Sequence, residues 1–249
     1  SIASGNYPVG STTIVWTVTD AHGNTQTCSQ VITVMDDEDP TVICPDQPVH
    51  GTDPGQCNAF VTVTVPVTED NCGVATLLNS YNGTGNASAT YPVGTTTVVW
   101  TVTDIHGNTK TCAQDIIVTD DEHPLITCPA AQSHLTDMGQ CNADILIGSP
   151  VASDNCGVAT ILNSYNGTDD ASDNYPVGST TVIWTVTDIH GNTSTCSQVI
   201  SVTDEDDPMI ACEAALMQGT EPGHCSANIT VTSPVASDNC GLASVVNSY

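Results

Sequence analysis

The fold of this chain is decided by residues 91–108, which read YPVGTTTVVWTVTDIHGN. Residues 96–103 alternate in character, which places Val98, Trp100 and Val102 on one face of a strand. Residues 104–108 contain the Asp, Gly and Asn that turns favour, and β-forming residues resume over 111–118. The segment therefore predicts a β-hairpin with a buried tryptophan.

The hairpin is one part of an 84-residue repeat. Trp16, Trp100 and Trp184 keep this step, and the twelve cysteines form four series that keep it as well. The series are Cys28, Cys112 and Cys196; Cys44, Cys128 and Cys212; Cys57, Cys141 and Cys225; and Cys72, Cys156 and Cys240. Because the 249 residues of the chain fall just short of three full periods, we expect its two ends to be neighbouring points of a cycle.

Composition excludes several partners and compartments. The 28 acidic residues stand against a single basic residue, Lys110, and give a formal net charge of −27. One cation cannot neutralise rows of phosphates, which excludes nucleic acid and anionic membranes as partners. Twelve cysteines favour an oxidising, extracellular or cell-surface location. No apolar stretch approaches the roughly 20 residues that span a bilayer. Without an initiator methionine or a signal peptide, we expect a mature or excised piece of a secreted protein.

Short strands separated by turns fill the rest of each period. Residues 41–44, 60–67 and 74–81 favour strands, and clusters of Pro, Gly, Asp and Asn separate them. A hydrophobic content of 39% supplies enough apolar surface for a core. Short strands with a turn about every 8 to 12 residues are typical of a sandwich. The chain is therefore predicted to be all-β, with tandem antiparallel β-sandwiches at the 84-residue repeat.

At these residues the chain resembles a known module, the hyalin repeat or HYR domain. The matching segments are DPTVICP at 39–45, TEDNCG at 68–73, YPVGTTTV at 91–98, TD at 103–104 with GN at 107–108, and Cys112 before an alternating strand. The last period departs from the pattern at Glu213, where the first two have a proline after the cysteine. The resemblance implies immunoglobulin-like extracellular sandwiches that serve as adhesion, spacer or stalk units and share no catalytic chemistry.

In the register of this module, residues 36–119 and 120–203 are complete repeats. Residues 1–35 are the C-terminal half of a preceding repeat, and residues 204–249 are the N-terminal half of a following one. A half sandwich would expose its core face and strand edges. Two interpretations stay open: the chain is a window of a longer polypeptide, or its copies complete one another by strand donation. Both predict copies arranged end to end, joined covalently or by strand complementation.

The strand order of an immunoglobulin-like sandwich suggests how the cysteines pair. Those early in the first and last strands of a repeat should lie level with each other, and those flanking the second strand can close a short loop. The predicted bonds are Cys44–Cys112, Cys57–Cys72, Cys128–Cys196, Cys141–Cys156 and Cys225–Cys240, and Cys28 and Cys212 take partners outside the chain or bond each other between copies. A rival scheme bonds Cys28 to Cys44, Cys112 to Cys128 and Cys196 to Cys212. It requires the chain to fold back at the acidic segment between repeats, where Pro40 and its equivalents favour an extended path.

Acidic residues gather where repeats join and in two turns of each repeat. Tracing strand direction places the joining segment and both turns at the same end of the sandwich. Carboxylates from several loops, without neighbouring basic residues, suit Ca²⁺, although the spacing of an EF-hand loop is absent. The candidate ligands are Asp36, Asp37, Asp39, Asp70, Asp104, Asp120, Asp121, Asp154, Asp188, Asp204, Asp206 and Asp238. The alternative is that the linker acids are solvated and that Asp70 and Asp104 only cap their own turns.

Five Asn-x-Ser/Thr sequences are candidate sites of N-linked glycosylation: Asn82, Asn86, Asn166, Asn192 and Asn228. Asn82 and Asn166 occupy the same turn of successive repeats, which makes them the stronger candidates. The others are expected by chance in a chain rich in Ser and Thr.

No constellation of catalytic residues is recognisable, because the histidines recur only with the hairpin turn. We therefore predict a non-enzymatic structural protein: an extracellular fibre or stalk of disulfide-locked repeats, stiffened by calcium and carrying sugar. One alternative is a cell-surface adhesin whose loops bind a receptor or glycan. Another is a spacer that carries an enzyme encoded elsewhere in the same polypeptide.

Overall fold

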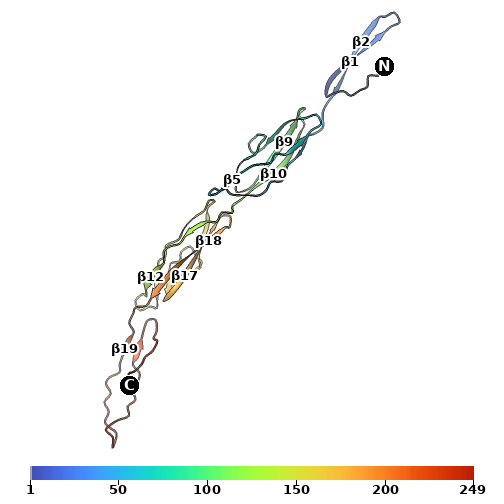
Figure 1. Ribbon diagram of the computed structural model, residues 1–249. Coiled ribbons are helices and arrows are strands. Elements are labelled where there is room, and N and C mark those ends of the chain that lie inside the picture. Colours follow the sequence, from blue (N-terminus) through green and yellow to red (C-terminus); the bar gives the residue numbers. More distant parts are fainter. Residues whose placement is uncertain (1) are drawn as a thin grey trace. The chain divides into compact units, whose positions relative to one another are not determined.

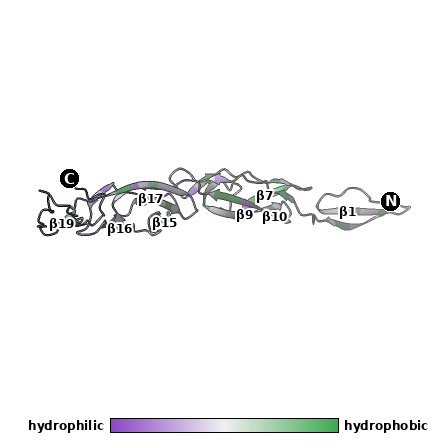
Figure 2. Cartoon of the chain, turned by 90° about the horizontal axis from the view of Figure 1, so that it is seen from below, coloured by the Kyte–Doolittle hydropathy of each residue, from purple (hydrophilic) through white to green (hydrophobic). Residues whose placement is uncertain are grey.

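In the computed structural model, which describes residues 2–249, strands and tight turns follow one another along the chain (Figure 1). The chain divides into two units, one up to Asp120 and one from Asp121 onward. Hydrophobic segments, green in Figure 2, lie on strands of both units. Residues 2–249 include no helix of the length and apolarity that crossing a membrane requires.

The described part of the first unit, residues 2–120, contains ten strands. They are β1 (Gly10–Thr19), β2 (Thr25–Val34), β3 (Thr41–Ile43), β4 (His50–Gly51), β5 (Asn58–Val61), β6 (Val67–Glu69), β7 (Val74–Asn79), β8 (Ala89–Pro92), β9 (Gly94–Asp104) and β10 (Thr109–Thr119). The hairpin predicted from residues 91–108 is β9 with β10, and Trp100 lies opposite Cys112 in its register.

The second unit repeats the pattern from β3 to β10 and adds two strands. Its elements are β11 (Leu125–Thr127), β12 (Gln132–Leu135), β13 (Asn142–Ile145), β14 (Val151–Ser153), β15 (Val158–Asn163), β16 (Asp173–Pro176), β17 (Gly178–Asp188), β18 (Thr193–Thr203), β19 (Met209–Ala211) and β20 (Val235–Ser237).

Each complete repeat is a sandwich of two layers. One layer is a four-stranded sheet in the order β4-β10-β9-β7, and the other consists of the pairs β3-β6 and β5-β8. The second unit has the same arrangement, with β12-β18-β17-β15 facing β11-β14 and β13-β16. All pairs are antiparallel except β4 with β10 and β12 with β18, which are parallel. In the first repeat the parallel pair arises because the chain crosses between the layers without reversing. After β3 has paired with β6 in one layer, the chain continues in the same direction as β4 and pairs with β10 in the other layer.

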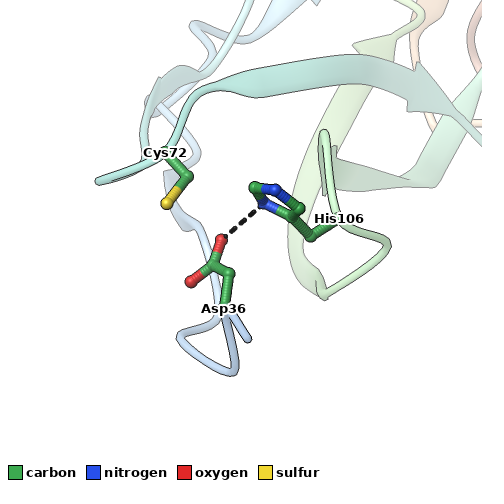
Figure 3. Close-up of side chains that lie close together, drawn as sticks. All are labelled: Asp36, Cys72 and His106. Atoms are coloured by element: carbon green, nitrogen blue, oxygen red, sulfur yellow. Dashed lines mark hydrogen bonds and ion pairs between the residues drawn. The ribbon is translucent and has the colours of Figure 1, made fainter. Parts of the chain in front are cut away.

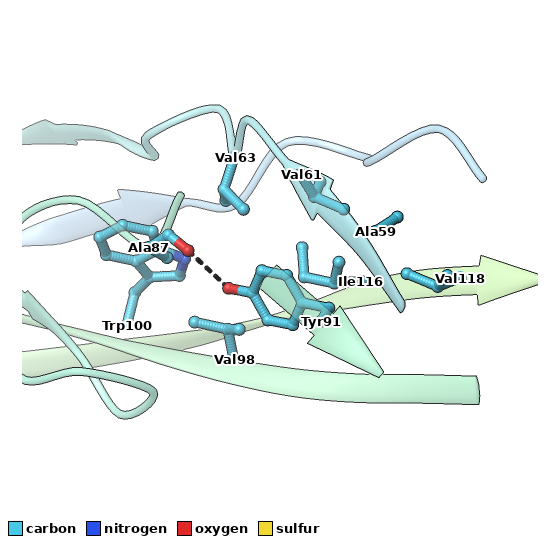
Figure 4. Close-up of a cluster of buried hydrophobic side chains, with 9 residues drawn as sticks. All are labelled: Ala59, Val61, Val63, Ala87, Tyr91, Val98, Trp100, Ile116 and Val118. Carbon is cyan, nitrogen blue, oxygen red and sulfur yellow. Dashed lines mark hydrogen bonds between the residues drawn. The ribbon is translucent and has the colours of Figure 1, made fainter. Parts of the chain in front are cut away.

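The core lies between the layers and is built from the same positions in both repeats. In the first it comprises Ala59, Val61, Val63, Ala87, Tyr91, Val98, Trp100, Ile116 and Val118 (Figure 4), and in the second the equivalent residues one period later. Trp100 and Trp184 are fully buried, as predicted. Their indole N–H groups donate to Gln114 and Gln198, at 2.9 and 3.4 Å, so that burial leaves no unpaired donor.

The strand expected over residues 60–67 is broken, which corrects that prediction. β5 ends at Val61 and β6 begins at Val67. Between them the backbone N–H groups of Val63 and Thr64 donate to the side chains of Ser88 and Gln47 instead of to a ladder. Pro66 has no N–H to donate, and the chain changes here from pairing with β8 to pairing with β3.

The half repeats leave their core faces uncovered. β1 pairs with β2, and β19 pairs with β20, each as a two-stranded sheet. Trp16 is partly exposed, whereas Trp100 and Trp184 are fully buried. Val18 is 67% exposed at a position where Val102 and Val186 are fully buried.

The disulfides match part of the predicted scheme. Cys44–Cys112 and Cys128–Cys196 form as predicted, with Cα atoms 5.9 and 5.8 Å apart. Because Cys44 bonds Cys112, the rival Cys28–Cys44 scheme is wrong, and Cys28 and Cys212 are free thiols.

The predicted short loops are wrong. Cys141 bonds Cys240, which rules out both Cys141–Cys156 and Cys225–Cys240. Cys72 is a free thiol, which rules out Cys57–Cys72, although Cys57 and Cys156 are also disulfide-bonded. The reason is distance: the predicted partners sit before and after two successive strands, such as β5 and β6, that run on in one direction. At about 3.3 Å per residue, these strands carry the two cysteines to opposite ends of the sandwich.

Candidate cation site at the acidic turns

Three acidic side chains from separate parts of the first unit come together at one end of its sandwich. Asp36 follows β2, Asp70 lies in the turn between β6 and β7, and Asp104 ends β9. One carboxylate oxygen of each lies within 4.8 Å of the other two. Tracing strand direction in the sequence leads to the same grouping of these three residues.

Asp104 organises the turn that follows it. Its Oδ1 accepts the backbone N–H groups of His106, Gly107 and Asn108 at 2.6–2.8 Å, and its Oδ2 accepts Asn108 Nδ2 at 2.7 Å. Gly107 adopts φ 100°, a conformation that disfavours other residues. Burial raises the pKa of Asp104, but the hydrogen bonds outweigh burial and hold the pKa below its ordinary value. The carboxylate is therefore ionised at neutral pH.

Asp70 divides its two oxygens between a turn and the cluster. Oδ1 accepts the N–H groups of Cys72 and Gly73 at 2.9 and 2.7 Å. Oδ2 is buried and has no hydrogen-bond donor. A carboxylate oxygen that is shielded from water and receives no donor is a costly arrangement unless a cation approaches it.

The side chain of Asp36 is enclosed as well, with only 2% of it exposed. His106 Nδ1 donates to its Oδ2 at 3.0 Å, and the thiol of Cys72 lies beside the same carboxylate (Figure 3). Asn108 Nδ2 also donates to the backbone oxygen of Asp36, at 3.2 Å. Asp36 is thus held by groups from two turns.

The second unit reproduces these turns. Asp154 Oδ1 accepts the N–H groups of Cys156 and Gly157, and its Oδ2 is again buried without a donor. Asp188 accepts the N–H groups of His190 and Asn192, and Asn192 Nδ2 at 2.7 Å. Burial raises the pKa of Asp188, but these hydrogen bonds have the larger effect. As for Asp104, the net pKa lies below the ordinary value of an aspartate.

The other predicted ligands differ in their exposure and in their hydrogen bonds. Asp37, Asp39, Asp121 and Asp206 are exposed, and Asp39 lies 3.5 Å from Lys110. Asp120 accepts from Thr52 Oγ1 at 3.4 Å, and Asp204 accepts from Thr136 Oγ1 at 3.3 Å. Asp238 accepts the N–H of Cys240 in the same kind of turn as Asp70 and Asp154.

Sequence reasoning gave no role to the asparagine that follows this aspartate. Asn239 Nδ2 donates to Asp204 Oδ1 at 2.9 Å and to the backbone oxygen of Gln140 at 2.8 Å. The hydrogen bond from Asn239 is the main cause of the lowered pKa of Asp204. The side-chain oxygen of Asn239 is also buried without a donor. The recurrence of Asn in the segment DNCG of every period was the signal that could have identified it.

The chemistry of the cluster fits a hard cation better than zinc. Asp36, Cys72 and His106 together resemble a mixed zinc ligand set. However, partial burial raises the pKa of the Cys72 thiol, and its hydrogen bond with Asp36 raises it further. In the later repeats, the cysteines at this position, Cys156 and Cys240, are in disulfides and offer no thiolate. The oxygens that every repeat supplies match Ca²⁺, which binds carboxylate and carbonyl oxygens in flexible geometry.

The strongest glycosylation candidates are exposed and also order their turns. Asn82 Oδ1 accepts Thr84 Oγ1 at 2.8 Å, and its Nδ2 donates to the backbone oxygen of Asn86. Asn166 makes the equivalent contacts. An amide linked to sugar keeps one N–H, so these turns are compatible with the modification. At Asn192, Nδ2 holds Asp188. Asn86 and Asn228 are exposed.

The HYR domain family model matches this chain twice, over residues 35–118 and 119–202. The chain is 31% identical to hyalin of Strongylocentrotus purpuratus over 251 residues, which cover 97% of this chain and 20% of that protein. It is 30% identical to hyalin of Lytechinus variegatus, with 96% of this chain and 46% of that protein covered. The chain therefore spans less than half of the length of either relative.

More distant similarities are to multidomain proteins. The sushi, von Willebrand factor type A, EGF and pentraxin domain-containing protein 1 of Rattus norvegicus is 28% identical over 72% of this chain and 4% of its own length. Among solved structures, protocadherin gammaB7 EC3-6 aligns with a TM-score of 0.36 at 16% identity, covering 92% of this chain and 68% of that one.

Proposed function

Because the chain belongs to the HYR domain family, and is a hyalin-like extracellular repeat protein with disulfides and no enzymatic role, we propose that it is a structural element of an extracellular fibre or stalk. Its repeats follow one another in a linear array and are stiffened by calcium at the acidic turns. Copies of the chain, or further repeats of the same polypeptide, continue the array at both ends.

The observation that carries this proposal is the equivalence of the two repeats. Nine core positions, among them the buried tryptophan, and the bridge between the first and last strands recur at the same place in both. Each repeat thus has a core and a covalent lock of its own. A protein that binds one receptor needs a distinctive site on one repeat, whereas a stalk gains length from every added repeat.

Calcium is the cation that the site would hold in this function. Asp36, Asp70 and Asp104 would supply carboxylate oxygens, among them the buried Asp70 Oδ2 that has no donor. The one basic side chain, Lys110, lies beside Asp39 and not within this cluster. A bound cation would neutralise the carboxylates and fix the segment around Asp36 against the two turns.

The half repeats supply a means of end-to-end assembly. In a complete repeat, residues of β5 and β8 cover the tryptophan face of the β9-β10 hairpin. The β1-β2 hairpin lacks this cover and exposes Val18 and part of Trp16. The matching half of the sandwich is residues 204–249 of a preceding copy, or the equivalent segment of a preceding repeat in the same polypeptide.

The test is assembly of the full chain in oxidising buffer with millimolar calcium, measured by sedimentation and electron microscopy. We expect linear particles that lengthen with concentration and shorten when calcium is chelated. Trp16→Asp should block assembly, whereas Thr17→Asp, on the opposite face of β1, should not. A wild-type chain that stays monomeric under these conditions, and instead binds glycans or a receptor, would replace the fibre with the adhesin alternative.

A further inference from the structure

One disulfide joins two successive repeats. Cys141 belongs to the repeat 120–203 and precedes β13, whereas Cys240 belongs to the following half repeat and comes after β20. Their Cα atoms are 4.7 Å apart and the sequence separation is 99 residues. Beside this bond, Asn239 donates to the backbone oxygen of Gln140, so that the same two turns are linked by a hydrogen bond as well. We call this cross-link the staple.

The second kind of bridge lies within a repeat. Cys128–Cys196 has a separation of 68 residues, as does Cys44–Cys112. The second unit thus shows both bridges, one that locks a repeat and one that binds it to the next.

The four free thiols are the equivalents of these four bonded cysteines. Cys212 corresponds to Cys128 and Cys28 to Cys196; Cys225 corresponds to Cys141 and Cys72 to Cys240. Each pair of equivalents is one or two whole periods apart. The pattern of the second unit therefore assigns every free thiol of the described residues a bridge type, and each assigned partner lies outside this copy of the chain.

We propose that Cys225 forms a staple with the next repeat, by bonding the cysteine there that is equivalent to Cys72. Cys72 of this chain forms the same bond with the equivalent of Cys225 in a preceding repeat. Cys212 and Cys28 form the matching bridge within the repeat that is completed at the same junction. This inference rests on the proposed linear array and adds its covalent chemistry. One head-to-tail junction satisfies all four thiols at once.

The oxidation needs an external acceptor of two electrons. A small disulfide such as oxidised glutathione supplies it: one protein thiolate attacks the small disulfide and releases one small thiol. The second protein thiolate then displaces the other small thiol and closes the bridge. Two protein thiols and one small disulfide thus yield one protein disulfide and two small thiols. Cys28, Cys212 and Cys225 are exposed to such a reagent, and Cys72 is partly exposed.

The test has two arms, because the following repeat comes from a second copy or from the same polypeptide. In one arm the 249-residue chain is oxidised in a glutathione buffer with calcium. In the other, two copies are fused through Asn-Gly-Thr, the residues that follow Tyr81 and Tyr165. Non-reducing digestion and mass spectrometry should yield a Cys225–Cys72 peptide, between chains in the first arm and within the fusion in the second. A staple found only in the fusion would overturn assembly from separate copies.

Matched variants separate the two bridges. Cys225→Ser should remove the Cys225–Cys72 peptide and leave the Cys212–Cys28 peptide, and Cys212→Ser should do the reverse. Linear particles that lack the Cys225–Cys72 peptide in both arms would overturn the staple while leaving the proposed function standing. A Cys225–Cys72 bond in a fusion that electron microscopy shows to be compact, and not a linear array, would overturn the proposed function alone. A Cys225–Cys240 or Cys141–Cys156 peptide would contradict the pairing rule itself.

Discussion

Replacing Asp70 with asparagine should change stability in opposite directions with and without calcium. Pairs of ionised carboxylates 4.8 Å apart repel by ~0.9 kcal/mol in a water-like dielectric and ~3.5 kcal/mol at an effective dielectric of about 20. Asp70→Asn removes two of the three pairwise repulsions. It keeps an Oδ1 that can accept from Cys72 and Gly73. In a chelator, the variant should therefore be more stable than the wild type by about 2 kcal/mol or more.

With calcium the order should reverse. A ligand at about 100 times its dissociation constant stabilises the folded state by about 2.7 kcal/mol. The wild type should gain this stability, whereas the variant lacks one carboxylate and should gain much less. For a repeat of this size, such differences shift the unfolding temperature by roughly 10 °C.

The assay is thermal unfolding followed by the fluorescence of the buried tryptophans, in EGTA and in millimolar calcium. Asp37→Asn is the matched control, because it removes the same charge from an exposed position in the same segment. It should alter both curves equally and slightly. If Asp70→Asn is destabilising in EGTA and the wild type unfolds at one temperature in both buffers, then Asp70 only caps its turn and the cluster does not bind calcium.

Three further predictions concern the fold and its surface. Replacing Cys44 and Cys112 together with serine should lower the unfolding free energy by about 4 kcal/mol, by the chain entropy of a loop with a separation of 68 residues, as measured by guanidinium titration. Burial raises the pKa of Tyr175 to about 12, so the protonated phenol should contribute its full stability below about pH 10 and lose it as the pH rises through 12. Tyr175→Phe should therefore flatten the dependence of the urea midpoint on pH, and an unchanged slope would contradict this assignment. In secreted material, intact mass should show sugar that Asn82→Gln removes, and identical masses would count against glycosylation there.

The fold followed from the sequence wherever a local pattern had a single structural solution. The alternation around Trp100 fixes which face is buried, because a slip of one residue would expose the tryptophan. The expected strand over residues 60–67 failed for the opposite reason. Its residues favour a strand throughout, and only the change of pairing partner near Pro66, which involves distant segments, divides it.

The acidic cluster could be predicted only in outline. Strand counting brings Asp36, Asp70 and Asp104 to one end of a sandwich, since consecutive strands reverse direction. Which linker acid turns inward depends on contacts that sequence patterns do not encode. Asp36 is enclosed by His106 and Asn108, while Asp37, the next residue, is exposed. Likewise, no pattern distinguishes an asparagine that caps a turn from one that, like Asn239, reaches across to Asp204.

The disulfides show a limit that periodic sequences impose. In a chain built from one repeated sequence pattern, a bond between neighbouring turns of one repeat and a bond to the next repeat join the same two cysteine series. Cys141–Cys156 and Cys141–Cys240 differ by one whole period, so the positions of the cysteines cannot decide between them. The strands decide, because β13 and β14 carry Cys141 and Cys156 to opposite ends of the sandwich, and the end that Cys141 reaches is the one that receives the following repeat. Disulfide connectivity therefore tests order along the array. Only a neighbour in correct register places a thiol where an external oxidant can close a bridge with Cys225, so at a mismatched junction Cys225 should stay a free thiol that can be alkylated.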